Sequence, residues 1–231
     1  MRMSRRSGLL ATGVLYDPVF SNNDWAAIIT ACQSGSVPDT WAVGDSKDMT
    51  INGASYTIDI IGKNHDTYSD GSGIAPLTFQ LHDCYGTEYA MNSSNTNANG
   101  WEGCTMRKTY LPVISSLMPA AVKAAIKNVN KLTSAGNEST TIKTSQDGLF
   151  LLSEVEIFGT TTYSVAGEGT QYAYYAAGNS KVKNYNGSAN FWWERSPYVN
   201  FATGFCLVNP DGNATASTAS DSCGVAFAFC F

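Results

Sequence analysis

The sequence predicts one α+β domain. Two segments carry apolar residues at helical spacing, several others alternate in the manner of strands, and no change of composition after about residue 20 marks a linker. No internal repeat is visible. We therefore expect an N-terminal extension over residues 1–20, followed by a single domain over residues 21–231.

The first helix is predicted within residues 21–35. Trp25, Ile28 and Cys32 recur at helical spacing, and Gly35 ends the pattern. Polar residues ahead of the apolar stripe offer N-caps. This segment is therefore expected to place one apolar face against the core.

The second helix is predicted over residues 119–131. Pro119 suits a first helical turn, and Val122, Ile126 and Val129 form an apolar stripe. The lysines between them are expected to face water, as in an amphipathic surface helix.

Strands are predicted on either side of these helices. The dipeptide Asn52-Gly53 is a hairpin signal between two β-like runs. From Phe191 onward the pattern is β again, and over residues 224–231 large apolar side chains alternate with alanine and cysteine. We expect this last strand to lie inside a sheet, because fraying would return its apolar surface to water. Residues 91–101 and 167–180 are interpreted as irregular loops.

Charge and composition exclude several classes of partner. Only 14% of residues are charged and the formal net charge is -5, which argues against nucleic acid as a partner. No apolar run approaches the ~18 residues of a membrane span, so no membrane insertion is expected. The basic start with Arg2, Arg5 and Arg6 is not interpreted as an export signal, because Thr12 and Gly13 interrupt the apolar stretch that follows.

Metal and cofactor sites are not expected either. The six cysteines are too dispersed for a metal finger and are interpreted as buried small hydrophobes. Residues 209–213, "NPDGN", fit a turn, but few carboxylates surround them, whereas Ca²⁺ needs several charged oxygen ligands. We therefore expect no cofactor and no metal.

The acidic and histidine motifs favour structural roles. The dipeptides His65-Asp66 and His82-Asp83 lack further ligands at suitable spacing, so hydrogen bonding is the better interpretation. Glu154 and Glu156 lie two residues apart in one apolar segment, whereas catalytic carboxylate pairs usually come from separate elements across a cleft.

Several motifs resemble a known family. The strings "FWWERSP" (residues 191–197) and "GVAFAFCF" (residues 224–231), together with "IIGKNHD" (residues 60–66), resemble C-type-lectin-fold variable proteins of diversity-generating retroelements in phages and bacteria. The similarity spans roughly residues 21–231. It implies a C-type lectin fold with two helices, a small antiparallel sheet and extensive irregular loops. In that family the C-terminal third carries exposed variable positions between fixed scaffold positions.

The residue alphabet after Arg195 agrees with this resemblance. Residues 196–231 contain no Lys, Glu, Gln, Met or Trp. In the resembled family, adenines of Asn-type (AAY) codons are mutated, and the resulting NNY codons never encode those residue types. A β surface that avoids long charged side chains for solubility is the simpler alternative interpretation.

The resemblance implies a proposed variable region over residues 196–223. Trp192, Trp193 and Arg195 precede it and are expected to be scaffold, with the tryptophans in the core and Arg195 holding the fold through buried hydrogen bonds or a carboxylate. The candidate variable, ligand-binding positions are Tyr198, Val199, Asn200, Phe201, Ala202, Thr203, Gly204, Leu207, Asn209, Pro210, Asp211, Thr215, Ala216, Ser217, Thr218, Asp221 and Cys223.

We therefore expect a non-enzymatic display protein: a phage tail receptor-binding protein in the virion, or a bacterial surface adhesin. Its expected partner is a bacterial surface protein or glycan, with Tyr198 and Phe201 as aromatic anchors. Whether it forms a homo-oligomer stays open. Two alternatives also stay open: an oxidase resembling formylglycine-generating enzymes that uses cysteines among Cys206, Cys223 and Cys230, and a purely structural tail module.

Overall fold

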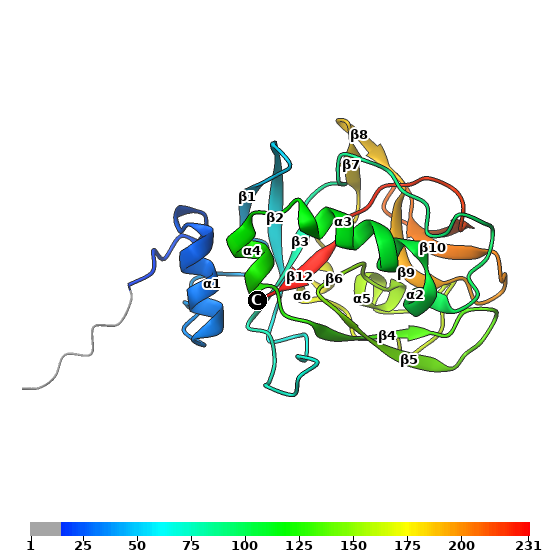
Figure 1. The fold of residues 1–231 in the computed structure, drawn as a ribbon, viewed down its shortest axis with the longest axis horizontal. Helices are drawn as coiled ribbons and strands as arrows, with labels where there is room; N and C mark the ends of the chain where they lie inside the picture. Colours follow the sequence, from blue (N-terminus) through cyan, green and yellow to red (C-terminus); the bar gives the residue numbers. More distant parts are fainter. Residues whose placement is uncertain (1–14) are drawn as a thin grey trace, which may run out of the picture.

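A five-stranded antiparallel sheet forms the centre of the molecule (Figure 1). Its strand order is β1–β2–β3–β12–β6, so the last strand of the chain lies between strands from much earlier in the sequence. The structure is a computed structural model that describes residues 15–231. The five strands are β1 (Ser46–Ile51), β2 (Ala54–Lys63), β3 (Leu77–Leu81), β6 (Leu149–Phe150) and β12 (Ala228–Cys230).

The hairpin predicted at Asn52-Gly53 is confirmed. Strands β1 and β2 pair antiparallel up to Ile51 and Ala54, which leaves only these two residues in the turn. Both have positive φ, 50° at Asn52 and 81° at Gly53, as a type I′ turn requires.

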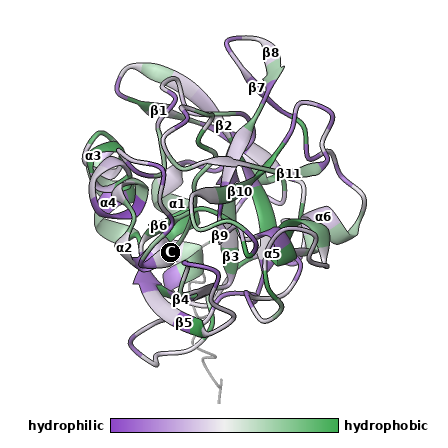
Figure 2. Ribbon diagram, turned by 90° about the vertical axis from the view of Figure 1, so that its right-hand side faces the viewer, coloured by the Kyte–Doolittle hydropathy of each residue, from purple (hydrophilic) through white to green (hydrophobic). Residues whose placement is uncertain are grey.

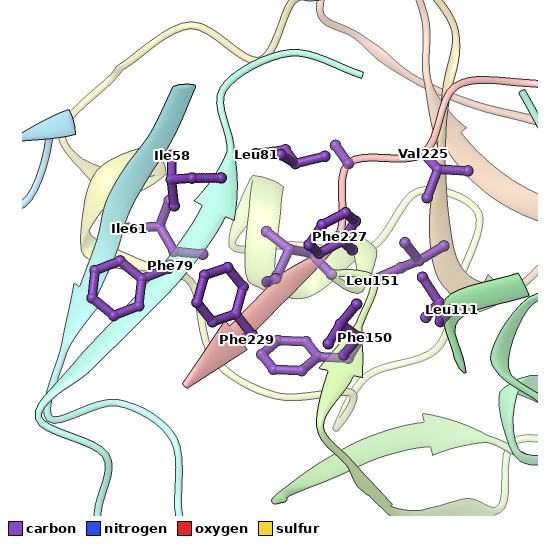
Figure 3. Close-up of a cluster of buried hydrophobic side chains, with 14 of the residues drawn as sticks. Ile58, Ile61, Phe79, Leu81, Leu111, Phe150, Leu151, Val225, Phe227 and Phe229 are labelled. Carbon is purple, nitrogen blue, oxygen red and sulfur yellow. The ribbon is translucent and has the colours of Figure 1, made fainter. Parts of the chain in front are cut away.

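Strand β12 lies inside the sheet, as predicted. It pairs with β3 on one side and β6 on the other, and the rings of Phe79 and Phe229 stack at 5.4 Å. The alternation predicted one strand face with large side chains and one with small side chains. The structure buries both faces, since Phe227 and Ala228 are each 0% exposed. Figure 3 shows the phenylalanines of this segment among side chains from β2, β3 and β6.

Smaller antiparallel sheets surround the central one, so the fold class is α+β with several small sheets rather than one. A three-stranded C-terminal sheet has the order β11–β10–β9. Two separate hairpins pair β4 with β5 and β7 with β8. The strands are β4 (Val129–Ser134), β5 (Ile142–Asp147), β7 (Lys183–Tyr185), β8 (Ser188–Asn190), β9 (Trp192–Pro197), β10 (Gly204–Val208) and β11 (Ala214–Thr218).

The first predicted helix is confirmed as α1, with Asp24 rather than an earlier residue as N-cap: its side chain accepts a hydrogen bond from the Ala27 N–H. The described residues hold more helices than the two expected, although most are one or two turns long. They are η1 (Phe20–Asn22), α1 (Trp25–Gln33), α2 (Gly100–Gly103), the π-helix η2 (Met106–Tyr110), α3 (Leu111–Ser116), α4 (Ala120–Ala125), α5 (Glu154–Phe158) and α6 (Ala173–Ala176).

The second predicted helix is too long, because α4 ends at Ala125. Ile126 adopts an extended conformation with ψ 128°, and the Lys127 N–H donates to the Cys230 carbonyl at 3.0 Å. Val129 then opens β4. The end of β12 and strand β5 offer backbone partners here, and such tertiary pairing overrides a weak helical propensity.

The chain packs into the core before residue 21, where the sequence analysis began the domain. The Tyr16 and Phe20 rings lie 5.8 Å and 5.4 Å from the Trp41 ring. Residues 1–14, which include the basic start and most of the expected extension, lie outside the described residues. Within residues 15–231 no helix is long and apolar enough to cross a membrane.

Candidate functional site

The loop between β9 and β10, residues 198–204, is held through its backbone by one buried side chain. The Asn97 Nδ2 group lies within hydrogen-bonding distance of the carbonyl oxygens of Tyr198, Phe201 and Gly204, at 3.2, 3.0 and 2.8 Å. The Asn97 N–H also donates to the Ala202 carbonyl at 2.7 Å. The loop conformation therefore depends on carbonyls, which every residue type supplies.

Asn97 is itself fixed in place. It is 0% exposed, and its Oδ1 accepts a hydrogen bond from the Asn137 N–H at 2.7 Å. The Asn-rich segment around it was predicted only as a loop, and its bridging role was not predicted. The only signal was the density of asparagines, which does not distinguish a buried bridge from exposed loop residues.

Two aromatic side chains of this loop meet at the surface. The rings of Tyr198 and Phe201 lie 5.1 Å apart, and Tyr163 meets Tyr198 edge to face at 5.5 Å. Phe201 is 57% exposed although it is a large apolar residue. An exposed aromatic side chain with a partly buried aromatic neighbour is the typical form of an interface anchor.

The loop is followed by the antiparallel hairpin β10–β11 (Figure 2). Its turn is the predicted "NPDGN" turn: the Gly212 N–H donates to the Asn209 carbonyl at 2.9 Å. The Asn209 side chain is used locally, because its Oδ1 accepts from the N–H groups of Asp211 and Asn213. In the three-stranded sheet β11 is an edge strand, and all its residues are half-buried.

Three of the predicted variable positions are buried and cannot belong to an exposed surface. A Cβ on Gly204 would lie 2.6 Å from the Ser217 carbonyl oxygen, so the close approach of β11 requires glycine. Leu207 is 1% exposed and Cys223 is 9% exposed. The remaining predicted positions are half-buried or exposed, and we call them the C-terminal face: Tyr198, Val199, Asn200, Phe201, Ala202, Thr203, Asn209, Pro210, Asp211, Thr215, Ala216, Ser217, Thr218 and Asp221.

The predicted scaffold residues lie in the core beside this face. Trp192, Trp193 and Arg195 are each 0% exposed. Arg195 Nη1 and Nη2 donate to the Glu156 carboxylate at 2.5 and 2.9 Å, and Arg195 Nε donates to Thr133 at 2.9 Å. The prediction that Arg195 holds the fold through buried hydrogen bonds and a carboxylate is confirmed.

A second cation extends this network. Lys131 Nζ lies 2.7 Å from Glu156 and 2.8 Å from Asp66, and it also donates to the Tyr172 hydroxyl at 3.0 Å. Burial opposes ionisation of Asp66, but Lys131 and a hydrogen bond from Thr78 lower its pKa to about 2. Because each ammonium hydrogen has an acceptor, this cluster is a saturated structural network.

Three further carboxylates lie buried behind the C-terminal face. Glu154 accepts from the N–H groups of the loop at 163–164, and the Tyr163 carbonyl in turn accepts from the Val199 N–H. Glu168 bridges Ser134 and Ser196, and burial raises its pKa to about 7.

Glu194 is the third carboxylate. It is 0% exposed, and neither of its oxygens has a hydrogen-bond partner among the described residues. Burial, together with the charges of Glu154 and Glu168, raises its pKa well above the usual range. Burial without a hydrogen-bond partner from residues 15–231 therefore favours the neutral form of this carboxyl over the charged form.

The cysteines and His65 occupy structural positions. Burial raises the pKa of Cys223 to about 12 and holds the pKa values of Cys206 and Cys230 well above the usual range, whereas a redox-active thiol needs an accessible thiolate. All six cysteines, which lie within the described part of the chain, are free. His65 stacks on Tyr172 at 4.0 Å. No group of three or more His, Cys, Asp or Glu between residues 15 and 231 is placed to hold a metal ion.

Comparison with known proteins places this architecture in a family. Residues 77–231 match the family described as "Domain of unknown function (DUF6273)". The chain belongs to this family. The DUF6273 match begins at the first residue of β3 and includes the whole C-terminal face together with Asn97, Lys131 and Arg195, whereas Asp66 lies before it. No curated protein and no solved structure matches the chain.

Proposed function

We propose that this protein is a non-enzymatic display protein with a C-type lectin fold, and that the C-terminal face binds its partner. The partner would be a bacterial surface protein or glycan, and the setting a phage tail tip or a bacterial surface adhesin. The resemblance of the "FWWERSP" and "GVAFAFCF" motifs supports the fold and the setting.

The observation that carries this proposal is the way in which Asn97 holds the loop at 198–204. Its side chain binds the carbonyls of Tyr198, Phe201 and Gly204, so the loop keeps its path when side chains change. A surface that is diversified requires this separation, because residues selected for binding must not also be required for folding.

The side chains of the C-terminal face also suit recognition. Tyr198 and Phe201 supply aromatic area, while Asn200, Thr203 and Asp211 supply exposed hydrogen-bonding groups. The same combination of rigid aromatic and adaptable polar residues is typical of antibody paratopes. The buried, high-pKa thiols of Cys206 and Cys230 count against the alternative of a cysteine-dependent oxidase.

Sequencing of codons 196–231 in several isolates, beside any nearby near-copy of this stretch, tests the proposal. We expect substitutions at adenine positions of the copy, concentrated in exposed positions such as Asn200, Phe201 and Asp211. Gly204 and Leu207 are expected to stay constant because both are buried. An invariant stretch, or changes confined to third codon bases, would contradict diversification and favour a fixed structural module.

A further inference from the structure

A second concave site lies away from the C-terminal face. A cavity of about 340 Å³ is lined by the first residues of β2 (54–57), by the turn of hairpin β7–β8 (184–187), and by residues 82–84 and 86. Both hairpins project from the same end of the molecule (Figure 1). None of its lining residues belongs to the region 196–223, so this cavity is a separate feature of the fold.

His82 lines the cavity and is oriented by Asp59, which lies outside the lining. His82 Nδ1 lies 2.7 Å from Asp59 Oδ2, and the side chains are 52% and 5% exposed respectively. Because the buried carboxylate accepts from Nδ1, it fixes the imidazole tautomer and orientation. His82 Nε2 has no hydrogen-bond partner in the described part of the chain and is left for a ligand.

Further polar groups around the cavity retain hydrogen-bonding capacity. Asp83 uses Oδ1 to accept from the Asn184 N–H and side chain, and its Oδ2 accepts no hydrogen bond from residues 15–231. The Tyr56 hydroxyl accepts from the Gly86 N–H at 3.2 Å, so its own O–H remains available to donate. The cavity therefore offers both donors and acceptors.

The remaining lining sets the character of the ligand. Tyr56 stacks on Tyr85 at 5.3 Å, which holds its ring in place. Buried Lys183 donates to the carbonyls of Leu81 and His82 at 2.6 and 2.8 Å, and thereby fixes the segment that carries His82. No Leu, Ile, Val, Met or Phe lines the cavity. Of the lining side chains, the Asp83 carboxylate offsets the charge that a protonated His82 supplies, so neither an anion nor a cation is strongly favoured.

We propose that this cavity binds a neutral saccharide, with a pyranose ring against Tyr56 and its hydroxyls bound by His82 and Asp83. A ring that carries several hydroxyls needs donors and acceptors that converge on it, while its C–H face packs on an aromatic side chain. The lining has no cluster of three or more His, Cys, Asp or Glu placed to hold a metal ion, so binding is expected to persist in the presence of a chelator. This proposal is independent of the function assigned to the C-terminal face.

The two histidines of the chain make a direct test feasible. The full-length protein is titrated with methyl glucoside, methyl galactoside, methyl mannoside and, separately, inorganic phosphate, while the imidazole C–H resonances are followed by NMR. We expect a saturable shift at His82 with at least one glycoside and a Kd of about 1–10 mM. His65, which lines a different cavity, is the internal reference and is expected not to shift.

Conservative variants locate the site. Tyr56→Phe is followed at the His82 resonance, whereas His82→Gln, which removes that imidazole, is followed at the resonances of the glycoside itself. Each variant is expected to weaken binding about tenfold, through loss of one hydrogen-bonding group. His65→Gln is the matched control and is expected to bind with unchanged affinity. Should His82→Gln unfold, Tyr56→Phe still decides, because it removes only a hydroxyl. A saturable shift with phosphate alone, no shift with any glycoside, or equal shifts at both histidines would overturn the proposal.

Discussion

Strands β11 and β12 draw on the same restricted residue alphabet but occupy opposite environments. Strand β12 lies between β3 and β6, and all of its residues are 0% exposed. Strand β11 pairs only with β10 and is half-buried throughout. The difference teaches that a segment without Lys, Glu, Gln, Met or Trp serves as core or as surface, depending on which strands lie on either side.

The two regions are also held in different ways. In β12 the side chains carry the packing, as in the stack of Phe229 on Phe79. In the loop that precedes β10, the carbonyls carry the contacts, through Asn97. Side-chain substitutions should therefore lower the free energy of unfolding strongly in β12 and little in the loop, provided that Asn97 still binds the loop carbonyls.

The largest expected effect comes from the same substitution, Phe to Ala, made once in β12 and once in the loop before β10. Phe229→Ala, at a position 0% exposed, is expected to lower the free energy of unfolding by about 3–5 kcal/mol, because it leaves a cavity in the central sheet. Phe201→Ala, at a position 57% exposed, is expected to change it by less than about 0.5 kcal/mol. Urea denaturation of both variants measures the difference; equal losses would show that the C-terminal face is required for folding.

A pH titration tests the carboxylate layer behind the C-terminal face. Burial raises the pKa of Glu168 from 4.5 to about 7, so between these values the folded state holds a proton that the unfolded state has lost. The stabilisation is complete below about pH 4.5 and is lost as pH rises through 7, a change of about 3 kcal/mol.

The control for this titration is Glu168→Gln, which keeps the shape and removes the titration. Its free energy of unfolding, measured by denaturant melts between pH 4.5 and 8, is expected to fall less steeply with pH than that of the parent. The difference between parent and variant removes the contribution of other groups that titrate between pH 4.5 and 8. One of these is His82, whose pKa is raised by its hydrogen bond to Asp59. Parallel pH profiles for the two proteins would contradict this assignment.

Asn97→Ala sharpens the contrast between backbone and side-chain support. It leaves buried carbonyls of the loop without their donor and is expected to cost about 1–3 kcal/mol. Hydrogen exchange of residues 198–204 should accelerate more than that of β12. Asn95→Ala is the matched control, because Asn95 is exposed and bonds only to Ser220 among the described residues. Unchanged exchange in the loop would show that Asn97 does not hold it.

The smallest expected effect lies on β11. Thr215→Lys introduces a residue type that is absent after Arg195, at a half-buried position on the edge strand. We expect a change below about 0.5 kcal/mol in the free energy of unfolding, because the side chain can extend into water. A loss above about 2 kcal/mol in the free energy of unfolding would mean that folding requirements, rather than mutation of AAY codons, restrict the residue types after Arg195.

The sequence predicted those features that local patterns encode. The turn at Asn52-Gly53, helix α1 and the internal position of β12 follow from turn chemistry, helical spacing and alternation. The exposure of the loop around Phe201 was also expected. The early end of α4 was not, because strand pairing with distant residues decides it.

The sequence by itself determined the α+β class, the hydrophobic identity of the core strands and the restricted alphabet of the last residues. Only the tertiary structure decided which positions of that alphabet are buried: Gly204 because the Ser217 carbonyl approaches it, Leu207 because it pairs between β9 and β11. Tertiary contacts also assigned Asn97 and Asp59 their partners, more than twenty residues away along the chain. Local patterns report what each residue prefers, whereas burial and hydrogen-bond partners depend on segments that meet only after folding.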